Sequence, residues 1–155
     1  INETIQMPSH PTCTIERANK DTIFRESDII SLHVPLTVKT RCLIGAKEIR
    51  LMKSGTQIIN TARGGIVNEQ DLYEALESGH LGGAAIDVFT EEPYKGSLSR
   101  LDQCLLTAHM GSMSVQSRVR MEAEATEEAV RLIEGKPLEA SVPEEEYANQ
   151  MMSLS

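Results

Sequence analysis

The sequence predicts an α/β protein in which a parallel β-sheet is flanked by helices. Short runs of aliphatic and β-branched residues alternate with segments whose apolar residues recur at helical spacing. Ile58 and Ile59 are adjacent rather than separated by a polar residue, which is typical of a strand covered on both faces. Polar residues follow several of the expected strands, at the edge where parallel α/β sheets bind ligands. These observations favour one open sheet with functional residues at the carboxyl ends of its strands.

The first half of the chain contains two expected strands and two short helical segments. No element is assigned to residues 1–20, whose prolines and mixed polarity match neither spacing. The first strand should stop before Pro35, because proline cannot donate a hydrogen bond within a sheet. The expected elements are a helical turn over 21–27 capped by Asp21, a strand over 29–34, a helix over 46–52 and a strand over 57–60.

The second half continues the alternation of strands and helices. Asn68 is a favourable N-cap for a helix that Gly79 should end. Apolar residues recur at near-helical spacing from Val115 to Ile133, in a helix that should end at Gly135. No helix is assigned to residues 90–103. The remaining expectations are strands over 84–89 and 104–107, a helix over 114–134, and an acidic tail or docking segment over 136–155.

Composition narrows the classes of function. The chain has 155 residues, 40% hydrophobic and 25% charged, which is enough for one domain with a core. Its net charge of −8 argues against a nucleic-acid partner. Cys13, Cys42 and Cys104 form no metal-binding pattern, and no apolar run is long enough to cross a membrane. We therefore expect reduced thiols, a cytoplasmic location and neither a metal nor a membrane partner. The first residue is Ile1 rather than methionine, which indicates a processed or partial chain.

The stretch from Gln57 to Gly65 is the one around which the other candidate residues are arranged. Asn60, Thr61 and Arg63 follow its expected strand, and two glycines then let the backbone turn sharply. An arginine at this edge could hold a carboxylate through two parallel hydrogen bonds. From this stretch alone, a strand–loop–helix junction with a merely solvated arginine is an equally good interpretation.

Chemically capable side chains follow the other expected strands as well. His33 follows the first strand and is expected to form a wall rather than to react, while His10 and His80 are expected to be surface residues. Asp87 lies within the third expected strand, where a carboxylate needs either a ligand amide or a structural hydrogen bond. His109 follows the fourth strand and could transfer a proton, with Glu92 as its candidate carboxylate partner. Taken alone, Glu91-Glu92-Pro93 is more simply interpreted as an exposed acidic turn.

Five motifs occur along the chain in the order that is typical of D-2-hydroxyacid dehydrogenases, so the sequence resembles that family. They fall within about residues 20–135, and the ordered set is more specific than any one motif. The run from Arg118 to Ala125 is most similar to phosphoglycerate dehydrogenase-like members. The motifs are Ser27-Asp28-Ile29-Ile30-Ser31-Leu32-His33-Val34-Pro35-Leu36-Thr37, Ile59-Asn60-Thr61-Ala62-Arg63-Gly64-Gly65, Ala85-Ile86-Asp87-Val88-Phe89, Glu92-Pro93 and Thr107-Ala108-His109-Met110-Gly111.

The resemblance implies an incomplete Rossmann-type sheet over residues 21–135, with an unassigned segment at 1–20 and a tail at 136–155. The implied activity is NAD-dependent interconversion of a D-2-hydroxy acid and its 2-oxo acid by a full-length homodimer. Arg63 would bind the substrate carboxylate and carbonyl, His109 would move the hydroxyl proton, and Glu92 would pair with His109. The residues that would border the cofactor are Val34, Pro35, Thr40, Thr61, Ala62, Arg63, His109, Gly111 and Asp87, the last through the nicotinamide carboxamide.

The sequence also departs from the family pattern. Ala108 stands where the family usually has proline, and Glu92 stands where formate dehydrogenase relatives have glutamine, which disfavours formate as substrate. No GxGxxG motif opens a helix after a strand, so neither the pyrophosphate cradle nor the group that separates NAD from NADP is identifiable. The sequence therefore resembles the C-terminal part of such an enzyme. The alternatives are a non-catalytic NAD-binding regulatory or interaction module and an unrelated α/β ligand-binding domain.

Overall fold

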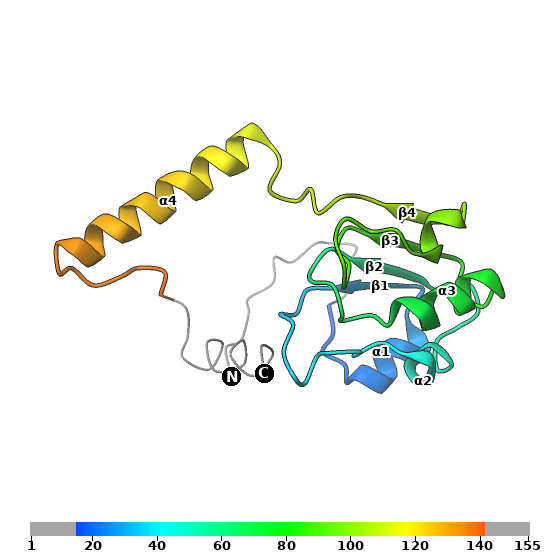
Figure 1. Ribbon diagram of the computed structural model, residues 1–155. Coiled ribbons are helices and arrows are strands. Elements are labelled where there is room, and N and C mark those ends of the chain that lie inside the picture. Colours follow the sequence, from blue (N-terminus) through cyan, green and yellow to red (C-terminus); the bar gives the residue numbers. More distant parts are fainter. Residues whose placement is uncertain (1–14, 142–155) are drawn as a thin grey trace.

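Four parallel strands form one sheet in the computed structural model, which describes residues 15–141 (Figure 1). The strands are β1 (Ile29–Leu32), β2 (Gln57–Asn60), β3 (Gly83–Ile86) and β4 (Cys104–Leu106), and they lie side by side in that order. Because all four run in the same direction, their carboxyl ends meet at one edge of the sheet. The predicted parallel α/β architecture is confirmed.

One face of the sheet packs against helices to form the core. The register places Ile30, Ile58 and Ala84 side by side on this face, and all three are buried. Three helices add side chains to the same cluster, among them Phe24 and Leu72. Figure 1 shows two of these helices below the strands and the third beside the sheet, at the right. They are α1 (Lys20–Glu26), α2 (Ala46–Ile49) and α3 (Glu69–Glu77).

The opposite face of the sheet is more exposed. Ile29 on β1 is 59% exposed and Leu105 on β4 is 65% exposed. The long helix α4 (Val115–Ile133) has no buried residue, and Figure 1 shows it held away from the sheet by the segment after β4. The spacing of apolar residues thus predicted the helix correctly, while its apolar side chains meet no core within residues 15–141. No helix among these residues is long and apolar enough to cross a membrane.

Side chains of helix α3 form hydrogen bonds with two other segments near the sheet. As predicted, Asn68 caps it, and its side-chain oxygen accepts hydrogen bonds from the Gln70 and Asp71 amides. The Asp71 carboxylate accepts the Ala46 amide at 2.8 Å, and the Glu69 carboxylate accepts the Thr90 amide at 2.7 Å. One helix therefore holds both the start of α2 and the loop that follows β3.

Several predicted boundaries are wrong. Asn19, not Asp21, caps α1 by accepting the Thr22 amide, and Asp21 lies in the first turn. Strand β1 ends at Leu32, before Pro35 is reached. Strand β3 ends at Ile86 rather than at residue 89, and a short 3₁₀ helix, η1 (Ser97–Arg100), occupies part of the segment left unassigned. Most of the segment 1–20, to which no element was assigned, and most of the tail expected over 136–155 lie outside the described residues, namely residues 1–14 and 142–155.

Candidate active site

The turn after β2 is locked by the buried side chain of Asn60. This residue is 2% exposed, its oxygen accepts the Ala62 amide at 3.2 Å, and its amide group donates to the Arg63 carbonyl at 3.1 Å. The turn also presses on the loop after β3, because a Cβ atom at Gly64 would lie 1.9 Å from the Phe89 carbonyl oxygen. Asn60 and Gly64 together fix the backbone from which the Arg63 side chain projects.

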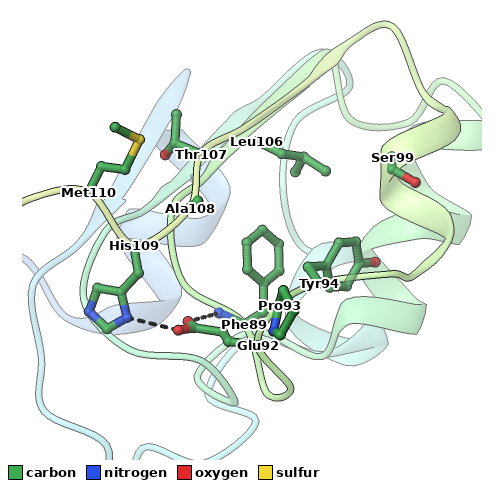
Figure 2. Close-up of a pocket in the computed structure, with 10 residues that line it drawn as sticks. All are labelled: Phe89, Glu92, Pro93, Tyr94, Ser99, Leu106, Thr107, Ala108, His109 and Met110. Atoms are coloured by element: carbon green, nitrogen blue, oxygen red, sulfur yellow. Dashed lines mark hydrogen bonds and ion pairs between the residues drawn. The ribbon is translucent and has the colours of Figure 1, made fainter.

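His109 and Glu92 form an ion pair or hydrogen bond across two loops. The His109 Nδ1 atom lies 3.0 Å from the Glu92 Oε2 atom, and the other carboxylate oxygen accepts the Phe89 amide at 3.0 Å (Figure 2). The Phe89 amide, and after it His109, lower the pKa of Glu92 below its usual value. The lowered pKa favours the ionised form of Glu92, which is paired with the imidazole ring of His109.

Asp87 organises the loop that carries His109. It lies just beyond β3 rather than within it, and it is 8% exposed. Its carboxylate accepts the Thr107 hydroxyl and the Met110 amide, the latter at 2.9 Å. Burial raises the pKa of Asp87, but hydrogen bonds from Thr107, Met110 and Gly111 outweigh burial and leave this pKa below its usual value. Of the two partners expected for this carboxylate, the structural hydrogen bond is present.

The backbone of His109 adopts a left-handed conformation that the same loop enforces. Its φ angle is +53°, a value that non-glycine residues seldom adopt, and its amide donates to the Asp87 carbonyl at 2.8 Å. Both the main chain and the side chain of Asp87 therefore bind the segment 107–110. The imidazole is aimed toward Glu92 by this arrangement and not by the strand itself.

Arg63, Glu92 and His109 line one cavity of about 430 Å³. They come from the loops after three different strands, β2, β3 and β4. The sequence prediction depended on these three groups meeting, and the fold brings them together at the carboxyl edge of the sheet. A cavity that combines a guanidinium, a carboxylate and an imidazole can bind an organic acid and transfer a proton to or from it.

A second, more apolar cavity of about 720 Å³ is also lined by Glu92 and His109. Figure 2 shows the Glu92 carboxylate between the ring of His109 and the backbone nitrogen of Phe89. The Phe89 and Tyr94 rings are stacked with their centroids 4.2 Å apart. Leu106 and Thr107 also line this larger cavity. The His109–Glu92 pair is thus bordered by a polar cavity and an apolar one.

The remaining predicted cofactor residues lie on the loops after β1, β2 and β4. The Thr40 hydroxyl donates to the Pro35 carbonyl at 2.6 Å, which closes the turn after Val34. Thr61 and Ala62 belong to the turn that Asn60 holds, and Gly111 follows His109. The ring of His33, expected to form a wall, lies 2.8 Å from the Ser31 hydroxyl.

Two expectations for other histidines have different outcomes. His80 was expected at the surface, but it is only partly exposed and its Nε2 atom lies 2.9 Å from the Ile49 carbonyl oxygen. His10 lies outside the described residues.

Sequence reasoning missed Arg41, which lines the cavity together with Arg63. It also missed the part that Thr107 and Met110 play in binding Asp87. Thr107 could have been found from its place at a strand end. Arg41 lies in a turn and carries no comparable signal.

Comparisons with known proteins give one consistent result. The family model described as D-isomer specific 2-hydroxyacid dehydrogenase, NAD binding domain, matches residues 4–111. A hydroxypyruvate reductase from Thermotoga maritima is 43% identical over 117 residues, which cover 73% of this chain and 38% of that protein. A D-3-phosphoglycerate dehydrogenase from Bacillus subtilis is 36% identical over 141 residues, which cover 85% of this chain and 27% of that protein.

Solved structures agree in fold. The crystal structure of a glyoxylate reductase from Paecilomyes thermophila has a TM-score of 0.79 and 35% sequence identity to this chain. The match covers 83% of this chain and 39% of that one. The chain thus spans less than two fifths of the length of each protein named here.

Proposed function

The chain belongs to the D-isomer specific 2-hydroxyacid dehydrogenase family, within its NAD binding domain, and on this premise we propose that it supplies the catalytic residues of such an enzyme. The proposed reaction is the interconversion of a D-2-hydroxy acid and its 2-oxo acid with NAD. The observation that carries the proposal is the single cavity lined by Arg63, Glu92 and His109.

Each of these side chains has a proposed role that follows from its geometry. The Arg63 guanidinium binds the substrate carboxylate through two parallel hydrogen bonds. Because the Nδ1 atom of His109 faces Glu92, its Nε2 atom is left to exchange the proton of the substrate hydroxyl. The ionised Glu92 holds the imidazole ring in this orientation. The bound NAD supplies or accepts the hydride.

The residues present fit one end of NAD better than the other. The Asp87 carboxylate accepts protein hydrogen bonds from Thr107 and Met110, and the spare lone pairs of its two oxygens could accept the amide of a nicotinamide. Val34, Pro35, Thr40, Thr61, Ala62 and Gly111 are the further residues proposed to border the cofactor. The sequence contains no GxGxxG motif for the pyrophosphate. We therefore propose that residues 21–135 form the nicotinamide-side part of a larger NAD-binding domain.

The experiment that tests this proposal is a turnover assay on the complete enzyme that carries this chain. NADH consumption is followed with a panel of 2-oxo acids, and His109→Gln is compared with His80→Gln, a histidine that lies outside the cavity. The His109→Gln variant should lose about 100-fold or more in kcat, because it cannot exchange the proton. The His80→Gln variant should keep its activity.

Full activity in His109→Gln would remove the assigned role of this residue. Tight NADH binding without turnover of any 2-oxo acid in the unaltered enzyme would favour the alternative, a non-catalytic NAD-binding regulatory or interaction module.

The proposal also includes the oligomeric state and the cellular location of the complete enzyme. A homodimer is proposed from the family resemblance, and light scattering of the purified enzyme tests it. A cytoplasmic location is proposed because Cys42 and Cys104 are free thiols, which suits a reducing compartment. Localisation of the tagged protein by cell fractionation tests the second point.

A further inference from the structure

Arg41 is held against the turn that carries Arg63. The Cys42 amide donates to the Gly65 carbonyl at 2.8 Å, and the Arg41 amide donates to the Thr37 carbonyl at 2.9 Å. A Cβ atom built on Gly65 would lie 3.9 Å from a guanidinium nitrogen of Arg41. These hydrogen bonds fix the backbone of Arg41, and its exposed side chain lines the same cavity of about 430 Å³ that Arg63 and His109 line.

The charges around this cavity do not balance. Arg41 and Arg63 contribute two guanidinium groups, and Glu92 contributes the one carboxylate among the lining residues. Both oxygens of Glu92 already have partners, the Phe89 amide and His109. Within residues 15–141, the Arg41 guanidinium takes part in no hydrogen bond or ion pair, and Arg63 donates only to the Ala62 carbonyl. The cavity thus offers more cationic donor groups than one carboxylate can satisfy.

We propose that Arg41 is a specificity-determining residue that binds a second anionic group of the substrate, either a carboxylate or a phosphate. The inference rests on the proposed function, in which Arg63 binds the carboxylate next to the reacting carbon. The substrate class is then a D-2-hydroxy acid that is at least a dianion. A guanidinium suits this task because its planar fork matches the oxygens of both carboxylate and phosphate.

The first test compares two acids that differ in one group. D-Malate carries a carboxylate where D-2-hydroxybutyrate carries a methyl group, so their steady-state kinetics with the complete enzyme and NAD isolate the second charge. D-3-phosphoglycerate forms a further arm, which separates phosphate from carboxylate recognition. The unaltered enzyme should oxidise at least one dianionic acid with a kcat/KM about tenfold or more above that for D-2-hydroxybutyrate.

Substitution of Arg41 should remove that preference. Arg41→Met should raise KM for the preferred dianion about tenfold and leave kcat nearly unchanged, since the group lies away from the reacting bond. Kinetics with D-2-hydroxybutyrate should change less than about twofold. Arg41→Lys, which keeps the charge but not the fork, should lie between them. Lys39→Met removes a cation from the same turn but outside the cavity lining, and should have no such effect.

The second test uses the 155-residue chain itself and does not require turnover. Titration with D-malate, followed by ¹H–¹⁵N NMR, should shift the Gly64 and Gly65 amides in the unaltered chain and much less in Arg41→Met. Thermal unfolding of each variant checks that the fold is kept.

The outcomes separate this inference from the proposed function. Equal loss for charged and uncharged acids in Arg41→Met, or no preference for dianions, overturns the role of Arg41 and leaves the dehydrogenase proposal standing. If no 2-hydroxy acid is oxidised, the proposed function fails. In that case, NMR shifts caused by D-malate that disappear in Arg41→Met would still support an anion site at Arg41. The absence of such shifts would overturn the anion site as well.

Discussion

At the scale of single residues, Asp87 is the group on which the geometry of His109 depends most. Its carboxylate binds Thr107 and Met110, and its carbonyl accepts the His109 amide. The place of Asp87 in an apolar stretch predicted that its carboxylate needs a partner, but it could not choose between a ligand and the protein. The choice depends on a loop 20 residues further along the chain, whose path no local pattern encodes.

Asp87→Asn should destabilise the chain by about 1–3 kcal/mol at pH 7, because an amide cannot accept all the hydrogen bonds that the carboxylate accepts. The pKa of Asp87 is lowered in the folded chain, so its stabilising effect is complete above the pKa of the unfolded carboxyl, about 3.9. This effect is lost as the pH falls through the lower, folded value. Urea unfolding between pH 3 and pH 7 measures both effects.

Asp102→Asn is the matched control, because Asp102 is exposed and its change should stay within about 0.5 kcal/mol. A free-energy difference between the Asp87→Asn variant and the unaltered chain that did not shrink toward acid pH would contradict the assigned hydrogen bonds.

At the scale of elements, the turn after β2 and the loop after β3 act as one unit because Gly64 lets them touch. Gly64→Ala would place a methyl group 1.9 Å from the Phe89 carbonyl oxygen, so the two backbones must separate. We expect a loss of about 1–3 kcal/mol in the free energy of unfolding. Denaturant unfolding measures it, and Gly111→Ala serves as control, since a Cβ there would have no neighbour within 4 Å.

A neutral Gly64→Ala would mean that the Arg63 and Glu92 loops are not in the contact described. In the complete enzyme the same variant should lower kcat as well, because Arg63 moves away from the His109–Glu92 pair.

The elements show which parts of a fold local patterns can predict. The strand over residues 57–60 and the Asn68 cap were predicted correctly, because adjacent β-branched residues and a capping side chain act locally. The strand expected over 84–89 was too long. Val88 and Phe89 are buried after β3 has ended, and hydrophobicity alone does not separate a strand from a buried loop.

The candidate site divides in the same way. Polar residues at strand ends were visible in the sequence, and the resemblance assigned their roles. Arg41 was not predicted, because it lies in a turn whose place beside Arg63 depends on hydrogen bonds between Cys42 and Gly65. Hydrogen bonds of this kind join backbone atoms of two distant turns, so they produce no periodic pattern of side chains in the sequence.

At the scale of the whole molecule, the chain presents an open sheet face and an unburied helix. Ile29 and Leu105 are exposed on the sheet, and Val119 and Ile133 are exposed on α4. Exposed apolar surface of this kind marks a place where a protein packs against another surface, and the matches cover less than two fifths of each relative named above.

The 155-residue chain alone should therefore bind NAD weakly, with a dissociation constant above the micromolar range, and should not turn over any 2-hydroxy acid. The reason is that a pyrophosphate cradle is missing from the sequence. Isothermal titration calorimetry with NAD measures the affinity. Micromolar binding by this chain would show that its residues hold the cofactor without a cradle.

Arg63, Glu92 and His109 are proposed to act together on one D-2-hydroxy acid beside one nicotinamide. The most direct measurement supplies the complete enzyme with NAD and a D-2-hydroxy acid deuterated at C2, and follows deuterium in the product NADH by mass spectrometry. We predict that deuterium passes from C2 to NADH, and that His109→Gln slows this transfer about 100-fold or more. NADH that stays free of deuterium with every 2-hydroxy acid supplied, in a folded enzyme, would contradict the central claim.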